Sequence, residues 1–310
     1  MTTNSTGFSA RSPKEDSATI NILLMILTII LMFVSVGGNA LTIAAVSRFK
    51  NLRYPSNIMI AALAISDFFV ASLFTTINLL RTHMPFLFTV RPSCLVVLFI
   101  TQTVSLTSVV FQAVLSLERF YAIQFPYHYH AHATTAIHAI WSASIAAAIV
   151  VLSLPVLSGI DQWSEEVVCY FPLLFPSSYT RIIAAIVIIF QILGLLAFLR
   201  VLFAEIKFRC RDRNLQTSEM EKPASLQSTL MVLAYGVSLC FYMPHIVYYF
   251  LGTLSNYSHN PLILEVLRVL DVCNTAVNYF IYGFKNRKFR EAYKCLLGFK
   301  RAHVQPLTTD

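Results

Sequence analysis

Seven long, mostly apolar blocks run through the chain, and they decide what it can fold into. Their approximate ranges are 20–46, 56–80, 93–123, 135–158, 179–206, 226–254 and 261–284. A helix that crosses a bilayer needs about 20 mostly apolar residues, and each block is long enough. A transmembrane barrel would show short alternating strands instead. The sequence therefore predicts an all-α membrane protein, a bundle of seven transmembrane helices.

The composition excludes the main soluble classes. Only 12% of the 310 residues are charged and 56% are hydrophobic, whereas soluble proteins carry about 25% charged residues. The net charge is +8, but no basic cluster alternates with aromatic residues as in a nucleic-acid-binding face. No nucleophile and base stand at catalytic spacing. We expect neither an enzyme nor a nucleic-acid-binding protein.

Basic residues gather in three segments. Sixteen of the 23 lysines and arginines follow block one, lie at the end of block five or in the loop after it, or follow block seven. Because loops rich in Lys and Arg stay in the cytoplasm, we expect the N-terminus outside the plasma membrane and the C-terminus inside. The predicted organisation is an extracellular segment 1–19, a seven-helix bundle over 20–284 and a cytoplasmic helix and tail over 285–310.

The tail begins with an amphipathic stretch. Its apolar residues recur at helical spacing between basic ones, at Phe289, Ala292, Tyr293 and Leu296. This pattern predicts a short helix on the inner leaflet, in contact with membrane lipids. Cys295 in this helix is a palmitoylation candidate, and a merely buried thiol is the alternative.

Two pairs of residues mark the predicted outer face. Asn4 and Asn256 each begin a glycosylation sequon, and Asn4 is the better candidate because Asn256 lies close to the membrane. Cys94 opens block three and Cys169 follows block four, both on the oxidising side. We expect them to form a disulfide, with two unpaired thiols as the alternative.

Short motifs in six of the seven blocks form an ordered series. They are Gly38-Asn39, Leu63 to Asp67, Cys94, Glu118-Arg119-Phe120, Trp141, Pro244 and Asn278-Tyr279-Phe280-Ile281-Tyr282. From about Asn39 to Cys295, the chain resembles the rhodopsin-like (class A) G-protein-coupled receptors. The resemblance implies a receptor that transmits an extracellular small-molecule or short-peptide signal to a heterotrimeric G protein, with a receptor dimer as a further partner.

Two other functions compete with this one. A receptor-like protein that binds or heterodimerises without coupling is the first alternative. A membrane transporter is the second, and it is less supported because transporters usually show paired repeats, which this chain lacks.

The resemblance also assigns a switch. Glu118 would restrain Arg119 until activation frees the arginine towards the G protein, with Asn278 and Tyr282 of block seven as further members. A lone arginine at this depth would be a snorkelling side chain instead. In block six, Tyr242 takes the toggle position, and Pro244 removes a backbone hydrogen bond and so provides a hinge.

Four polar residues match positions that hold a sodium ion in related receptors, namely Asp67, Ser108, Asn274 and Asn278. A hard cation prefers clustered oxygen ligands, and polar packing between helices is the alternative. We expect no other metal and no cofactor.

Several parts of the family's switch are altered. Tyr242 replaces the usual Trp, Tyr279 the usual Pro, Ser238 the usual Phe, and Gln112 a usual aliphatic residue. We take from this the hypothesis that the balance between inactive and active states is unusual, with appreciable basal signalling.

Polar residues in the outer half of the blocks are candidates for ligand contact: Thr101, Gln102, Ser105, His245, Tyr249, Arg268 and Asp271. Thr101 stands where amine receptors carry an aspartate, so a conventional amine receptor is not expected. Arg268 and Asp271 are three residues apart and either neutralise each other or face an acidic and a basic group of a ligand. His245 is a ligand contact or a packing residue.

Overall fold

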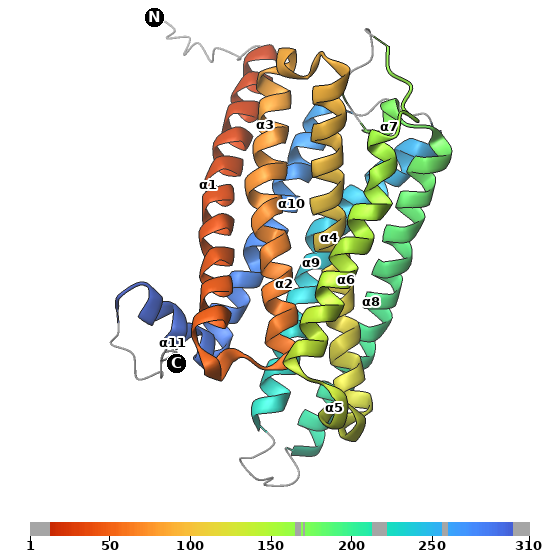
Figure 1. Ribbon diagram of the computed structural model, residues 1–310. Helices are drawn as coiled ribbons and strands as arrows, with labels where there is room; N and C mark the ends of the chain where they lie inside the picture. Colours follow the sequence, from red (N-terminus) through yellow and green to blue (C-terminus); the bar gives the residue numbers. More distant parts are fainter. Residues whose placement is uncertain (1–12, 165–168, 170, 213–221, 256–259, 300–310) are drawn as a thin grey trace, which may run out of the picture.

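The computed structural model describes residues 13–164, 169, 171–212, 222–255 and 260–299 (Figure 1). Seven long helical segments run side by side. They are α1 (Pro13–Arg48), α2 (Pro55–Phe69) continued through a π-helical turn (Val70–Phe74) into α3 (Thr75–His83), α4 (Arg91–Gln124), α6 (Thr135–Ser153), α8 (Ser177–Asp212), α9 (Lys222–Ser255) and α10 (Pro261–Lys285). Short elements between or after them are η1 (Lys50–Leu52), η3 (Pro85–Phe88), α5 (Pro126–His132), η4 (Leu154–Leu157), α7 (Phe171–Leu174) and α11 (Arg287–Leu296).

The segments form the predicted bundle. Five of them are long and apolar enough to cross a membrane, and α9 and α10, which pack against each other and against α8 and α1 respectively, complete the seven. Large apolar side chains such as Phe33, Trp141 and Phe203 are exposed on the outside of the bundle, as lipid contact requires. Charged side chains in the N-terminal half of α10, such as Arg268 and Asp271, contact other helices instead.

Proline and asparagine residues set several helix starts. Pro55 and Pro261 occupy the first turns of α2 and α10, where the missing N–H has no intrahelical partner to lose. The Asn260 side chain accepts a hydrogen bond from the Leu262 N–H at 2.9 Å and caps α10. Asn286 accepts one from the Lys288 N–H at 3.0 Å and separates α10 from α11.

The predicted amphipathic helix after the seventh span is α11, and its apolar stripe packs on protein. Phe289 and Ala292 are almost fully buried, in a cluster with Phe49 and Tyr282 at the inner ends of α1 and α10. The Tyr293 hydroxyl lies 2.7 Å from the Thr42 Oγ1 of α1. Contact with the bundle therefore fixes α11 beside α1 (Figure 1).

A disulfide joins Cys94 and Cys169, whose Cα atoms lie 5.8 Å apart, as predicted. It ties Cys169 to the first turn of α4, at the end of the bundle that the sequence predicts to lie outside the cell, called the outer end below. Both cysteines are buried with Val156 of η4 and with Leu174 and Phe175 at the end of α7, so the disulfide belongs to an apolar cluster at this end of the bundle.

The approach of α1 to α10 depends on a glycine. The ring of Tyr279, which stands in place of the family's proline, lies so close to Gly38 that a Cβ there would collide with it. The neighbouring Gly37 has nothing within 4 Å of the place a Cβ would take. The two glycines therefore differ in what an added methyl group would do.

We predict that Gly38→Ala lowers the free energy of unfolding by about 1–3 kcal/mol, because overpacking forces the helices or the Tyr279 ring to shift. Gly37→Ala is the matched control: it gains helix propensity of about 0.5–1 kcal/mol without a collision, so it should not lower stability. Thermal unfolding of the two purified variants in detergent measures the difference. Equal melting temperatures for both would contradict the close contact between α1 and α10.

Candidate functional site

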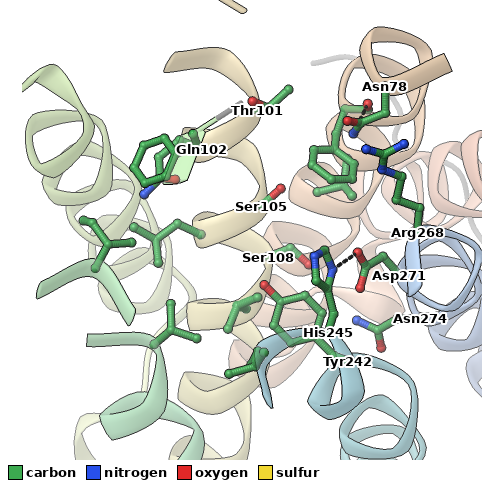
Figure 2. Close-up of a pocket in the computed structure, with 18 of the residues that line it drawn as sticks. Asn78, Thr101, Gln102, Ser105, Ser108, Tyr242, His245, Arg268, Asp271 and Asn274 are labelled. Carbon is green, nitrogen blue, oxygen red and sulfur yellow. Dashed lines mark hydrogen bonds and ion pairs between the residues drawn. The ribbon is translucent and has the colours of Figure 1, made fainter. Parts of the chain in front are cut away.

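A cavity of ≈ 200 Å³ lies in the half of the bundle that holds the Cys94–Cys169 disulfide. Side chains from the π-helical turn Val70–Phe74 and from α3, α4, α8, α9 and α10 line it, together with Phe171 of α7. Six of the predicted ligand contacts lie on its wall: Thr101, Gln102, Ser105, His245, Arg268 and Asp271 (Figure 2). The side chain of the seventh, Tyr249, lies outside the described part of the chain. Asn78 and Arg81 also line the cavity. Asn78 is one of the polar residues that the sequence places in the outer half of the blocks, whereas Arg81 was not predicted to contact a ligand.

Arg268 and Asp271 do not neutralise each other, which corrects one of the two alternatives drawn from the sequence. Arg268 Nη1 lies 2.5 Å from Glu265 Oε1, on the same helix, and 3.0 Å from Thr82 Oγ1 of α3. Asp271 Oδ2 lies instead 2.5 Å from His245 Nδ1 of α9. The Arg268 side chain therefore points towards α3, whereas the Asp271 side chain, three residues further along α10, points towards α9. This difference separates the two charges. His245 both packs against α10 and lines the cavity.

Below the cavity, Asp67 is completely buried. Ser108 Oγ of α4 donates to its Oδ1 at 2.6 Å, and Asn278 Nδ2 of α10 donates to its Oδ2 at 2.8 Å. Asn274 is also buried, and its Oδ1 has no hydrogen-bond partner among the described residues. Ser108 and Asn274 also line the cavity floor, so all four residues predicted for a sodium site belong to one region.

At the inner end of α4, Glu118 and Arg119 form an ion pair in which each side chain is only 8% exposed. Arg119 also donates to the Ser56 hydroxyl of α2 and, at 3.2 Å, to the Tyr129 hydroxyl of α5. The Tyr129 hydroxyl in turn donates to Glu118 Oε1 at 2.5 Å. His138 Nε2 of α6 lies 3.6 Å from the same oxygen. Three helices besides α4 therefore hold the pair.

Tyr129 was not among the predicted switch residues. Burial and then the negative charge of Glu118 raise the pKa of its phenol, so the hydroxyl stays protonated and remains a donor. Pro126 could have indicated this role from the sequence, because proline favours the first turn of a helix. A new helix does begin there, directly after α4, and Tyr129 lies in its first turn.

The other predicted switch residues lie elsewhere. Asn278 contacts Asp67, while Tyr282 is buried against Phe289, and its hydroxyl has no hydrogen bond within the described ranges. Tyr242 lines the cavity, and Pro244 lies inside α9, which is helical on both sides of it.

Two of the altered core positions are buried without full hydrogen bonding. Gln112 on α4 and Ser238 on α9 are 4% and 2% exposed. The Gln112 Nε2 and the Ser238 Oγ have no partner in the described part of the chain. A buried polar group without a partner costs about 1–3 kcal/mol, so the inner core carries a local penalty that aliphatic or aromatic residues would not impose.

The sequence model of the protein family described as 7 transmembrane receptor (rhodopsin family) matches residues 38–282, which is most of the chain. The chain belongs to the rhodopsin family of seven-transmembrane receptors. It is similar to trace amine-associated receptor 5 of Rattus norvegicus, 26% identical with 94% of this chain and 89% of the relative covered. It is also similar to growth hormone secretagogue receptor type 1 of Homo sapiens, 25% identical with 90% of this chain and 81% of the relative covered.

Membership of this family decides the class of function. The protein is a multi-pass plasma-membrane receptor and not an enzyme, and the family implies G proteins and small-molecule or peptide ligands as partners. The transporter alternative is thereby excluded. The two sequon asparagines, Asn4 and Asn256, lie outside the described residues. The Cys295 thiol is free and half-buried in α11, and its palmitoylation stays a prediction.

We predict that Tyr129→Phe raises basal signalling of this receptor several-fold. The variant loses a hydrogen bond to the Glu118 carboxylate, and such a bond to a charged group contributes about 1.5–3 kcal/mol. Even half of this shifts a two-state equilibrium several-fold. G-protein dissociation in cells that express equal amounts of receptor at the surface measures the effect.

The matched control is Tyr127→Phe, which removes the same atom from a side chain that is 90% exposed on the same short helix. Unchanged basal signalling in both variants would mean that Tyr129 does not restrain the Glu118–Arg119 pair.

Proposed function

We propose that this receptor binds a small molecule in the outer cavity and transmits the signal along the bundle to a heterotrimeric G protein at the Glu118–Arg119 end. The observation that carries the proposal is the arrangement of α4. This helix supplies Thr101, Gln102 and Ser105 to the cavity wall and, four turns further, the buried ion pair. A shift of α4 against its neighbours therefore reaches both sites.

The proposed orientation has the cavity outside the cell and the ion pair in the cytoplasm. The basic loops support it through the tendency of Lys and Arg to stay inside. The Cys94–Cys169 disulfide at the cavity end supports it as well, because disulfides persist in oxidising compartments.

We also propose contacts with lipids at the exposed apolar side chains and beside α11. A receptor dimer stays a prediction from the resemblance. A receptor-like protein that does not couple is disfavoured, because the Glu118–Arg119 pair is complete and held by Ser56 and Tyr129.

The proposal is tested through basal signalling. The Gln112 and Ser238 atoms without partners penalise the described arrangement, in which Glu118 and Arg119 are paired. We therefore predict G-protein dissociation without ligand in at least one class of G-protein sensor. Arg119→Ala should reduce this signal to background, because it removes the guanidinium proposed to reach the G protein. A wild-type signal equal to that of Arg119→Ala in every sensor, at equal surface expression, would contradict basal coupling.

For the buried polar cluster, we propose that a sodium ion binds beside Asp67, held also by Ser108, Asn274 and Asn278. The unpartnered Oδ1 of Asn274 supports this, since it is a buried oxygen without a donor in the described ranges. The carboxylate and the neutral oxygens suit a hard cation. A bound cation would offset the burial of the Asp67 charge and stabilise the packed arrangement of α2, α4 and α10.

We predict that NaCl raises the melting temperature of the purified receptor more than N-methyl-D-glucamine chloride at the same ionic strength. At ten times the dissociation constant, binding adds about 1.4 kcal/mol to the free energy of unfolding. Asp67→Asn should abolish the difference between the two salts. Equal melting temperatures in both salts for the wild-type receptor would exclude the site.

A further inference from the structure

We infer that the ligand of the outer cavity carries a positively charged nitrogen and that Asp271 is the residue that binds it. This rests on the proposed function, in which the cavity is the ligand site. Amine receptors carry an aspartate at the position that Thr101 of α4 occupies here, so this chain lacks that usual anchor for an amine. We infer that Asp271 of α10 takes its role.

The first observation is an unfilled carboxylate oxygen. Asp271 is only 6% exposed, and its Oδ2 faces His245 Nδ1 at 2.5 Å. Its Oδ1 is buried and has no hydrogen-bond partner among the described residues. A buried carboxylate needs its lone pairs satisfied, and Asp271 lines the cavity beside His245 (Figure 2). A ligand with a hydrogen-bond donor could supply the missing partner of Asp271 Oδ1.

The two arginines of the cavity offer less to an acidic ligand. Arg268 already donates to Glu265 Oε1 at 2.5 Å and to Thr82 Oγ1 at 3.0 Å. Arg81 donates to the side chain of Asn78 and, at 3.2 Å, to the carbonyl of Cys169. An acid would have to compete with these acceptors for the two guanidinium groups, whereas a cation meets an acceptor at Asp271 Oδ1 that has no partner in the described part of the chain.

Two more polar atoms without hydrogen-bond partners lie on the side of the cavity formed by α4. The Oγ of Ser105 and the Nε2 of Gln102 are buried without a hydrogen-bond partner in the described part of the chain, and Figure 2 shows both residues on the same helix. They can serve a polar substituent on the ligand, while Ile183 and Val187 of α8 supply apolar wall. The inferred ligand is amphiphilic.

The size of the cavity limits the ligand further. Pockets for drug-sized molecules have volumes of about 300–1,000 Å³, and this cavity holds ≈ 200 Å³. A small organic amine fits this space better than a peptide. The nitrogen would share Asp271 with His245, one residue after Pro244 on α9, so binding would alter a direct contact between α9 and α10.

The test uses matched probes that differ in one functional group. The sets are benzylamine, benzyl alcohol and benzoic acid; cyclohexylamine, cyclohexanol and cyclohexanecarboxylic acid; and the N,N-dimethyl derivatives of both amines. The melting temperature of the purified full-length receptor is titrated with each probe, which yields a dissociation constant. We expect at least one amine to raise it, with the matching alcohol and acid roughly tenfold to a hundredfold weaker.

Asp271→Asn keeps the shape of the side chain and removes its charge, and it should weaken the amine by a similar factor. Asp161→Asn is the matched control, because this outer carboxylate pairs with Arg91 and does not line the cavity. If Asp271→Asn fails to fold, the preference of the wild-type receptor for amine over alcohol and acid still decides the matter. No shift with any amine, tighter binding of an acid, or full amine affinity in Asp271→Asn would each overturn the inference.

The readout separates this inference from the proposed function. Melting temperatures need no G protein, so amine binding with silent sensors would refute coupling alone. Basal coupling that depends on Arg119, with no amine binding, would refute only the assignment of the ligand.

Discussion

The hydrocarbon core of a bilayer offers no hydrogen-bond partners to a polypeptide backbone, and the rest of the structure follows from this constraint. Each crossing segment must satisfy its N–H and C=O groups internally, which a helix does. Side chains obey the same rule, because polar groups inside the bilayer are costly unless they find partners. Asp67 and the Glu118–Arg119 pair are accordingly buried between helices and hydrogen-bonded. Polar residues on the inward faces thus create the sites that a receptor needs.

These sites lie in sequence along α4. Its outer turns line the cavity, Ser108 in its middle binds Asp67, and its inner end carries Glu118 and Arg119. In the described part of the chain, polar side chains join α4 to α2, α5 and α6, so a shift of α4 changes the partners of these side chains at both levels. Coupling of this kind needs two arrangements of the bundle, and a ligand favours the one that it binds better.

Much of this could be predicted from the sequence, because it depends on local patterns. Apolar length located the seven spans, helical spacing located α11, and the outer positions of Cys94 and Cys169 favoured their disulfide. Contacts between side chains on different helices could not be predicted in this way, because they depend on how the helices pack. Spacing alone paired Arg268 with Asp271, whereas the structure joins Asp271 to His245 of α9. Tyr129 was missed for the same reason: its role depends on how α5 folds back under α4.

If Arg119 reaches the G protein as proposed, G-protein binding must release it from Glu118 and open this end of the bundle. Spin labels on Tyr127→Cys and on a cysteine introduced at the cytoplasmic end of α9 would measure this in nanodiscs. We predict that nucleotide-free G protein adds a population with a longer distance between the two labels in the otherwise wild-type receptor. The same addition should leave the distance distribution of the Arg119→Ala receptor unchanged. A single distance that is unaffected by the G protein in both receptors would contradict the account.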